Sequence, residues 1–299
     1  MKKILYITIL VFVFSMTPIK ALPWSDLAIG AKSAALGSAY SAVSGDIESL
    51  WYNPAGIAEL RSISVMFSHL LWIGDINYEY LAFGMPIGTT MAWGASINYS
   101  YMKDNYIDES GIKGGTFTAS NLVFDAGLAI NLGRFDAGLS MKILSETLES
   151  QSDSGYAFDA GFIFHMIERY VDMGLTFRDF LGGATNSKTS VSDPSDFSVK
   201  IGALEKNFIK GIFLTQDYTY NPEYNTSFFN FGIQETFILN NIDLVLRAGY
   251  DMKGSQIGGA AGVSAGMGIR FNGFAIDYCF TTYDFAGNSH RFTLGYVFL

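Results

Sequence analysis

The residues that could carry out chemistry are few and lie far apart in the sequence. The chain has three histidines, His69, His165 and His290, and a single cysteine, Cys279. A metal centre needs several ligands that converge within a few ångströms, and these residues have no ligand-like spacing. His290 follows Ser289, but this loop pair lacks a third member for a hydrolase triad. No phosphate-binding loop or dinucleotide fingerprint occurs. The sequence therefore predicts a protein that is not an enzyme and holds no metal or cofactor.

Isolated charged residues are more informative, because they stand at alternate positions of otherwise apolar segments. They would share one face, which we expect to point into a lumen: Asp125, Arg134, Asp136, Asp159, Asp172, Arg247 and Asp277. Burying such groups is costly unless they are paired or hydrated. Two interpretations follow: an ion-pair network that holds an internal segment against a wall, or a polar path that lines a channel. Both need the same inward register, so the sequence leaves them open.

The elements that position these charges are strands. In the last segment, 291–299, Phe292, Leu294, Tyr296 and Phe298 fall on one face and smaller or polar residues on the other. The same alternation recurs in the segments 121–131, 134–143, 156–166, 171–178, 242–251 and 274–281. A soluble β-sandwich also alternates, but here one face is rich in aromatic residues and the other in Gly. These faces suit a lipid-facing exterior and a crowded lumen, and so predict an all-β, transmembrane antiparallel β-barrel.

The composition agrees with strands as the membrane-spanning elements. Hydrophobic residues make up 49% of the chain and the mean hydropathy is +0.23, yet beyond the N-terminus no run of about 18 apolar residues exists. The formal net charge is −9, which argues against a nucleic-acid partner. We expect outer-membrane lipid to be the surrounding partner.

The connections between strands alternate in length. From residue 62 onward we count about 14 strands, an even number typical of bacterial outer-membrane barrels. Short turns fall near 86–89, 131–133, 167–169, 204–208, 239–241 and 271–273. Longer connections rich in Gly, Ser, Asn and Asp are expected near 72–77, 102–119, 145–155, 179–195, 221–227, 251–262 and 284–289. Residues 62–299 are therefore predicted to form the barrel, with short turns on the periplasmic side.

The N-terminal part precedes the strand pattern. Lys2 and Lys3 followed by an apolar run predict a signal peptide over 1–21, and hence export to the bacterial outer membrane. Residues 22–61 are rich in Gly, Ala and Ser and have no alternating stretch long enough to span lipid. We expect a small helical hatch in or just below the lumen, with a turn at Asn53, Pro54, Ala55 and Gly56.

A resemblance to a known family rests on this segment. The Gly/Ala-rich stretch 30–39, then Ala42, Asp46 and the stretch 51–58 around Asn-Pro-Ala-Gly, resembles the start of the PorV/PorQ-like outer-membrane proteins. That group includes the UPF0164 proteins and is similar to the FadL long-chain fatty acid transporters. The resemblance implies a 14-stranded barrel whose hatch, with Asn53 to Gly56, occludes the lumen, and a lateral opening that passes hydrophobic ligands toward the membrane. The chain is short for a FadL-type transporter and ends in Leu299 rather than in an aromatic residue.

The resemblance, together with a plugged lumen and aromatic loop tips, implies diffusive uptake of hydrophobic small molecules such as fatty acids. One alternative is a PorV-like accessory of type IX protein secretion, which would bring secretion-system proteins as partners. Another is a structural barrel without a transported ligand. The sequence does not decide among the three.

Overall fold

The computed structural model describes residues 28–107, 113–149, 151–186, 192–194, 196–207, 209–253 and 260–298. The predicted signal peptide, 1–21, lies outside these ranges and stays a prediction. Among the described residues, no helix is both long enough and apolar enough to cross a membrane.

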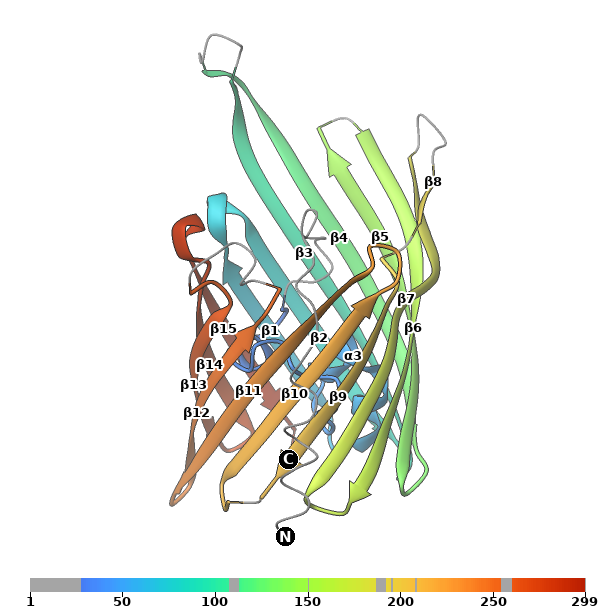
Figure 1. Cartoon of the computed structure of the whole chain (residues 1–299), viewed down its shortest axis with the longest axis vertical. Helices are drawn as coiled ribbons and strands as arrows, with labels where there is room; N and C mark the ends of the chain where they lie inside the picture. The colour runs from blue at the N-terminus through green and yellow to red at the C-terminus, as the bar shows by residue number, and fades with distance from the viewer. Residues whose placement is uncertain are drawn as a thin grey trace.

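Fourteen long antiparallel strands of the described chain form a closed barrel (Figure 1). The strands are β1 (Ser64–Leu71), β2 (Asn77–Ile87), β3 (Met91–Ile107), β4 (Lys113–Asn131), β5 (Phe135–Leu148), β6 (Gln151–Ile167), β7 (Val171–Asn186), β9 (Ser198–Lys206), β10 (Ile212–Asn221), β11 (Thr226–Leu239), β12 (Ile242–Asp251), β13 (Val263–Phe271), β14 (Phe274–Thr282) and β15 (Asn288–Val297). Each pairs with the next in sequence, and β1 pairs with β15 to close the ring. Within the part of the chain that the structure describes, the short β8 (Ser192–Pro194) pairs only with β7. The predicted barrel of about 14 strands is confirmed.

The register aligns apolar side chains in rows on the outer surface. Phe67 on β1 lies opposite Leu294 on one side and Leu81 on the other, and Leu81 lies opposite Ile97. All four are large, apolar and 42–53% exposed. In a closed barrel such a surface is stable only against lipid, because water would meet a continuous apolar band. The alternation read from the sequence thus separates a lipid-facing exterior from the lumen.

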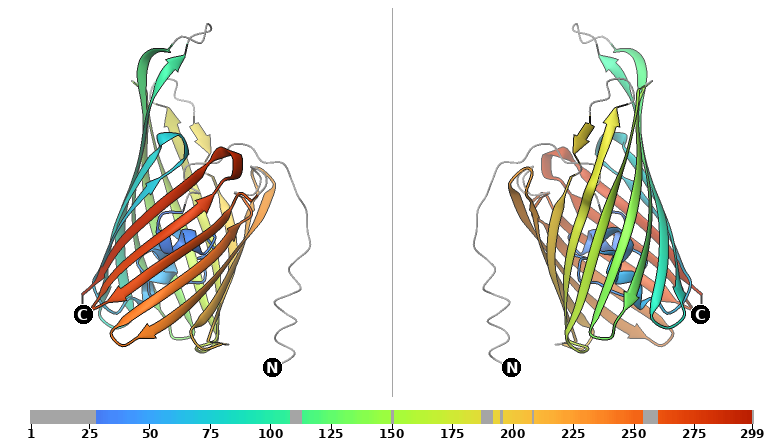
Figure 2. Two further views of the ribbon diagram at one scale, coloured as in Figure 1. Left: turned by 90° about the vertical axis from the view of Figure 1, so that its left-hand side faces the viewer. Right: turned by 90° about the vertical axis from the view of Figure 1, so that its right-hand side faces the viewer.

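The two ends of the barrel differ. The turns after β2, β4, β6, β9, β11 and β13 share one end with the C-terminus, which we call the turn end (Figures 1 and 2). At the opposite, loop end, the hairpin of β3 and β4 rises above its neighbours, followed by that of β5 and β6 (Figure 1). Two short 3-10 helices, η3 (Ile73–Asp75) and η5 (Asp284–Ala286), also lie in loop-end connections.

Three connections expected to be loops are largely strand. β3 and β4 cover most of 102–119, β5 and β6 nearly meet within 145–155, and β7 continues to Asn186. The expectation of long loops there was wrong because strands that extend beyond the membrane face water on both sides. They keep their backbone ladder without any need for apolar alternation.

Candidate functional site

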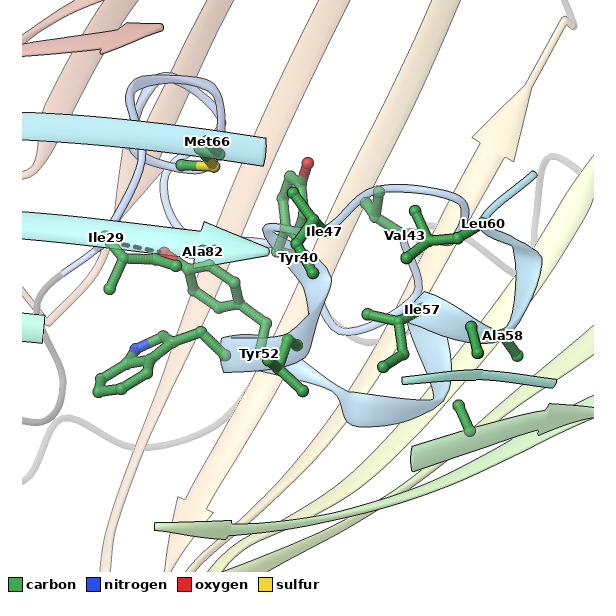
Figure 3. Close-up of a cluster of buried hydrophobic side chains, with 14 of the residues drawn as sticks. Ile29, Tyr40, Val43, Ile47, Tyr52, Ile57, Ala58, Leu60, Met66 and Ala82 are labelled. Carbon is green, nitrogen blue, oxygen red and sulfur yellow. Dashed lines mark hydrogen bonds between the residues drawn. The ribbon is translucent and has the colours of Figure 1, made fainter. Parts of the chain in front are cut away.

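The N-terminal segment 28–60 lies inside the barrel and is called the hatch from here on (Figure 2). It contains two short helices, α2 (Ala31–Ala35) and α3 (Ser49–Tyr52), and the 3-10 helix η2 (Pro54–Glu59). Its apolar side chains pack on one another and on Met66 and Ala82 of the wall (Figure 3). Within this cluster the Ile29 N–H donates to the Tyr52 hydroxyl at 3.3 Å. The hatch therefore has a small core of its own, completed by the barrel.

The Asn-Pro-Ala-Gly turn starts η2 and also joins the hatch to the wall. Asn53 is the N-cap, since its Oδ1 accepts from the Ala55 N–H at 3.0 Å, and Pro54 takes the first helical position. The Asn53 Nδ2 donates to the carbonyl oxygens of Ser41 at 2.6 Å and Phe162 at 3.2 Å. Because Asn53 is fully buried, all of these bonds are made away from water. The motif fixes the hatch against β6.

Glycines on the inner face make room for the hatch. A Cβ on any of ten of them would lie within about 3.0 Å of another atom, in most cases of the hatch: Gly84, Gly94, Gly127, Gly138, Gly161, Gly174, Gly202, Gly232, Gly249 and Gly266. We call these residues the glycine belt. At Gly138 and Gly174 the obstruction is hatch backbone, which cannot swing aside as a side chain can. The belt thus lets the hatch backbone approach the wall closely and closes the lumen at this level.

Polar side chains of the wall bind hatch backbone on the opposite side of the barrel. Asp217 on β10 accepts from the N–H groups of Tyr40 and Ser41, each at 3.0 Å. Its neighbour Thr215 donates to the Ala39 carbonyl at 2.9 Å. Two further contacts are Asn230 to the Gly37 carbonyl at 2.6 Å and the Ala31 N–H to Thr293 at 2.8 Å. These bonds satisfy backbone groups that a short, irregular segment could not pair within itself.

A cluster of buried charges lies where the hatch meets β5, β6 and β7. The Lys142 ammonium contacts Asp159 at 2.7 Å and Asp179 at 2.9 Å. The same ammonium lies 5.0 Å from the ring centroid of Trp51 in α3, and the Arg178 guanidinium lies 5.7 Å from it. Two cations on one buried indole are stabilised electrostatically by the ring face. The ion-pair network thus touches the hatch directly, and we call these charges together with Trp51 the Trp51 cluster.

The wall is irregular beside this cluster. Along β7, three-residue steps, Phe177 to Phe180 and Phe180 to Gly183, face two-residue steps on β6, so β7 carries two successive bulges. Asp179 and Leu181 have positive φ angles, 54° and 51°. A left-handed backbone is costly for a residue such as Leu and persists only where the surroundings enforce it. The first bulge turns Asp179 inward, and the second leaves Leu181 77% exposed on the outside.

An apolar groove of about 920 Å³ runs over the outer wall next to the bulges. Its lining comes from β3 to β7 and includes Leu139, Met141, Phe158, Phe180 and Leu181. Leu139 is 63% exposed, which shows that the groove opens outward. The bulged strand therefore separates a buried charge cluster from an apolar groove on the lipid side.

The charged residues expected in the lumen fall into three groups. Asp125 on β4 lies opposite Lys142 in the register and belongs, with Asp159, to the Trp51 cluster. Arg247 contacts Asp277 at 2.7 Å, and Arg270 contacts the same carboxylate at 2.9 Å. Asp136 and Asp172 flank His165 at the turn end.

Arg134 does not face the lumen, and its assignment there was wrong. Arg134 is exposed in the turn before β5. The strand and its alternation begin at Phe135, one residue later than we expected.

Several important residues were missed by sequence reasoning. Asp179 was placed in a loop, and Arg178 was not distinguished from other polar strand residues. A bulge puts these two neighbours on the same side, which a period of two cannot reveal. Trp51 stood in the recognised motif but had no role assigned. Among the described residues, one group of three has the convergence expected of metal ligands: Glu59, Asp136 and His165.

The hatch also holds a partly buried ion pair of its own. Lys32 pairs with Asp46 at 2.6 Å, and Tyr40 donates to Asp46 at 2.9 Å. Burial tends to raise the pKa of Asp46, but the Lys32 ammonium outweighs it and holds that pKa below its ordinary value. Glu48 accepts from the Ser33 N–H at 3.0 Å. Burial, with the nearby Asp46 charge, raises the pKa of Glu48 to about 7.

Comparison with known proteins agrees with this architecture. Residues 24–145 match the model of an uncharacterised protein family, UPF0164. No curated protein matches the sequence. The toluene transporter TodX of Pseudomonas putida is similar in structure, with a TM-score of 0.58 and 12% identity over 93% of this chain and 98% of that one. A Pseudomonas aeruginosa FadL homologue gives 0.57 and 10% over 90% and 98%.

A TodX deltaS2S3 mutant, described as a monoaromatic hydrocarbon channel, also matches, with a TM-score of 0.57 and 10% identity over 89% of this chain and 96% of that one. At such identities the likeness shows the fold. The expected resemblance to UPF0164 and to the FadL-like barrel is thereby confirmed. These three solved structures are described as a channel, a transporter and a FadL homologue, and not as enzymes.

Proposed function

We propose that this protein is an outer-membrane channel for the diffusive uptake of hydrophobic small molecules, which leave the lumen through the wall at the β7 bulges. The observation that carries the proposal is the position of those bulges. They interrupt the β6–β7 ladder beside the Trp51 cluster, and an apolar groove lies directly outside. A fatty acid or a similar molecule could pass from lumen to lipid there without crossing the hatch.

The packing of the hatch supports a lateral rather than an axial route. The hatch fills the glycine belt; its backbone is hydrogen-bonded to β10, β11 and β15, and its Asn53 side chain is hydrogen-bonded to β6. Moving it aside would break many buried bonds at once, each worth about 0.5–1.5 kcal/mol net. A route through the wall avoids this cost, and it also delivers an apolar molecule to the phase in which it is most stable.

The residues on the inner face of the wall near the loop end favour a small or amphipathic ligand. Leu70 and Tyr78, paired across β1 and β2, are buried on the inner face, whereas Tyr80 and Val123 pack in the core that the hatch completes. Buried polar residues of β3 lie opposite the two tyrosines, Ser100 opposite Tyr78 and Asn98 opposite Tyr80. Such a mixed lining has apolar surface for a hydrocarbon part and hydrogen-bonding groups for a polar head.

Location in the bacterial outer membrane is part of the proposal. The exposed apolar rows require lipid around the barrel, and closed barrels of this kind have all backbone groups paired between strands. A cleavable signal over residues 1–21 would direct export. Outer-membrane lipid and a hydrophobic ligand are then the expected partners.

One observation favours the alternative of a PorV-like accessory of protein secretion. The hairpin of β3 and β4 rises beyond the rest of the rim and could present a surface to a secretion-system protein (Figure 1). A channel for small molecules has no evident need of this projection.

A strain that lacks the protein separates the two functions. We expect slower uptake of radiolabelled long-chain fatty acid or toluene, restored by a plasmid copy, with normal display of secreted surface proteins. Unchanged uptake together with lost display would overturn the channel proposal in favour of the accessory role.

A further inference from the structure

Three side chains from different elements converge at the turn end of the barrel. Glu59 ends η2 in the hatch, Asp136 is the second residue of β5, and His165 lies near the end of β6. One potential ligand atom from each lies within 4.8 Å of the other two. The His165 Nε2 and the Asp136 Oδ2 are 3.3 Å apart. The three groups belong to segments far apart in the sequence, so only the folded barrel with its hatch assembles them.

Each of these side chains is held from behind by a second partner. The His165 Nδ1 is 3.0 Å from Asp172 Oδ1, and Asp172 in turn contacts Lys206. Asn131 donates to the Asp136 Oδ1 at 2.7 Å. Ser44 donates to the Glu59 Oε2 at 2.5 Å. A carboxylate behind a histidine keeps the proton on the nitrogen that faces it, which leaves the lone pair of the other nitrogen free for a metal.

The inward-facing atoms are left unsatisfied by the chain. Within the described residues, the Asp136 Oδ2 and the His165 Nε2 are buried and, apart from their 3.3 Å contact with each other, have no hydrogen-bond partner. The Asp136 side chain is fully buried. With Nδ1 protonated, two acceptors would face each other at 3.3 Å, which is unfavourable unless a cation lies between them.

The spacing suits a metal ion. Two ligands about 2.1 Å from a zinc ion and 3.3 Å from each other subtend an angle of about 104°, close to tetrahedral. Glu59 would supply the third ligand, and both Glu59 and His165 are partly exposed, so an ion can reach the site from the turn end. Imidazole together with carboxylates favours zinc or another divalent transition metal over calcium or magnesium.

We propose that Glu59, Asp136 and His165 bind a divalent transition-metal ion, with Zn²⁺ as the fitting probe, and that this ion fastens the hatch to the barrel wall. A fourth position is open to water from the turn end. The rival state is a protonated His165 that pairs with the carboxylates and binds no ion.

The test uses the full-length barrel in detergent, stripped with a chelator and titrated with Zn²⁺ by calorimetry. We expect about one ion per chain. Glu59→Gln and His165→Gln are each expected to weaken binding by about tenfold or more, and Asp172→Asn by about 10–100-fold. His69→Gln is the matched control, because His69 also pairs with a carboxylate, Glu79, at 2.8 Å on the wall. It should bind Zn²⁺ as the wild type does.

Two further readouts keep the result interpretable. The migration of unheated samples on a gel shows whether each variant has folded. Zn²⁺ should raise the unfolding temperature of the wild type and not that of Glu59→Gln, since only the wild type can be fastened through the hatch. The proposal is overturned if the folded wild type binds no Zn²⁺. It is equally overturned if the Glu59 and His165 variants bind as tightly as the wild type, or if His69→Gln loses as much as they do.

Discussion

The ammonium of Lys142, on the barrel wall, lies 5.0 Å from the ring centroid of Trp51, in the hatch. Lys142 also holds the carboxylates of Asp159 and Asp179, and Asp179 owes its inward position to a β7 bulge. One buried cation thus joins the hatch, the wall and the irregular strand. Disturbing any of the three should affect the other two.

Trp51→Ala should loosen the hatch. It removes a fully buried indole on which two cations lie, and truncations of this kind cost about 3–5 kcal/mol. We expect a lower unfolding temperature and faster proteolysis of the hatch in detergent. Trp93→Ala on the outer wall is the control, since Trp93 contacts Phe83 and not the hatch. Equal sensitivity of the two variants would contradict the role given to Trp51.

Lys142→Met should destabilise the barrel more than a surface substitution does. It leaves the buried Asp159 and Asp179 with only the more distant Arg178, 4.0 Å from each, and removing one partner of a buried pair costs about 3–5 kcal/mol. Lys103→Met on an exposed part of β3 serves as the control in urea unfolding. Adding Asp159→Asn to Lys142→Met should recover part of the loss, and a double variant no better than the single one would count against the pairing.

Gly138→Ala should displace the hatch. The new methyl group would meet the backbone of Pro54 and Ala55, and overpacking typically costs about 1–3 kcal/mol. Gly295→Ala is the matched control, because its methyl group would approach no atom closer than 3.4 Å. We expect larger single-channel currents in planar bilayers for Gly138→Ala only. Currents equal to those of Gly295→Ala would show that the belt does not hold the hatch.

Because of the raised pKa of Glu48, the free energy of unfolding should fall as the pH rises. The pKa is raised from 4.5 to about 7 by burial, so between these values the folded chain binds more protons than the unfolded one. Stability contributed by the protonated form is complete below about pH 4.5 and is lost as the pH rises through about 7. Glu48→Gln should therefore be more stable than the wild type at pH 8 by about 1–3 kcal/mol, seen as a higher unfolding temperature, but not at pH 5. Exposed Glu223→Gln is the control, and a pH-independent difference would contradict this account.

The sequence carried enough information for the barrel but not for the site. Alternation in segments such as 121–131 and 291–299 predicted the strands and their outward faces, because successive side chains of a membrane-spanning strand face lipid and lumen in turn. The count of strands and connections predicted an even strand number. The abundance of Gly on the inner face was visible, yet its cause was not. Only the position of the hatch shows that Gly138 and Gly174 face hatch backbone.

Two kinds of feature were hidden for physical reasons. The pairs that define the charge cluster join residues far apart in sequence, as Trp51 and Lys142 do, and no local pattern encodes such a contact. The β7 bulges reverse the alternation, so Asp179 resembled a loop residue although its side chain is turned inward. The same absence of local pattern concealed the convergence of Glu59 with Asp136 and His165.

The lateral route can be tested by fastening the bulged wall. Phe158 and Phe180 are paired across the β6–β7 ladder at the bulges, so Phe158→Cys with Phe180→Cys should form a disulfide there. Phe135→Cys with Phe164→Cys, paired on the regular β5–β6 ladder, is the matched control. Both are made with Cys279→Ala, which removes the single native thiol.

The decisive measurement is uptake of labelled fatty acid and toluene by cells that carry each oxidised barrel, before and after reduction. We predict that the disulfide at the bulges stops uptake, that a reductant restores it, and that the control disulfide has no effect. Uptake that continues unchanged through a barrel fully oxidised at Phe158→Cys and Phe180→Cys would contradict passage through the β7 wall.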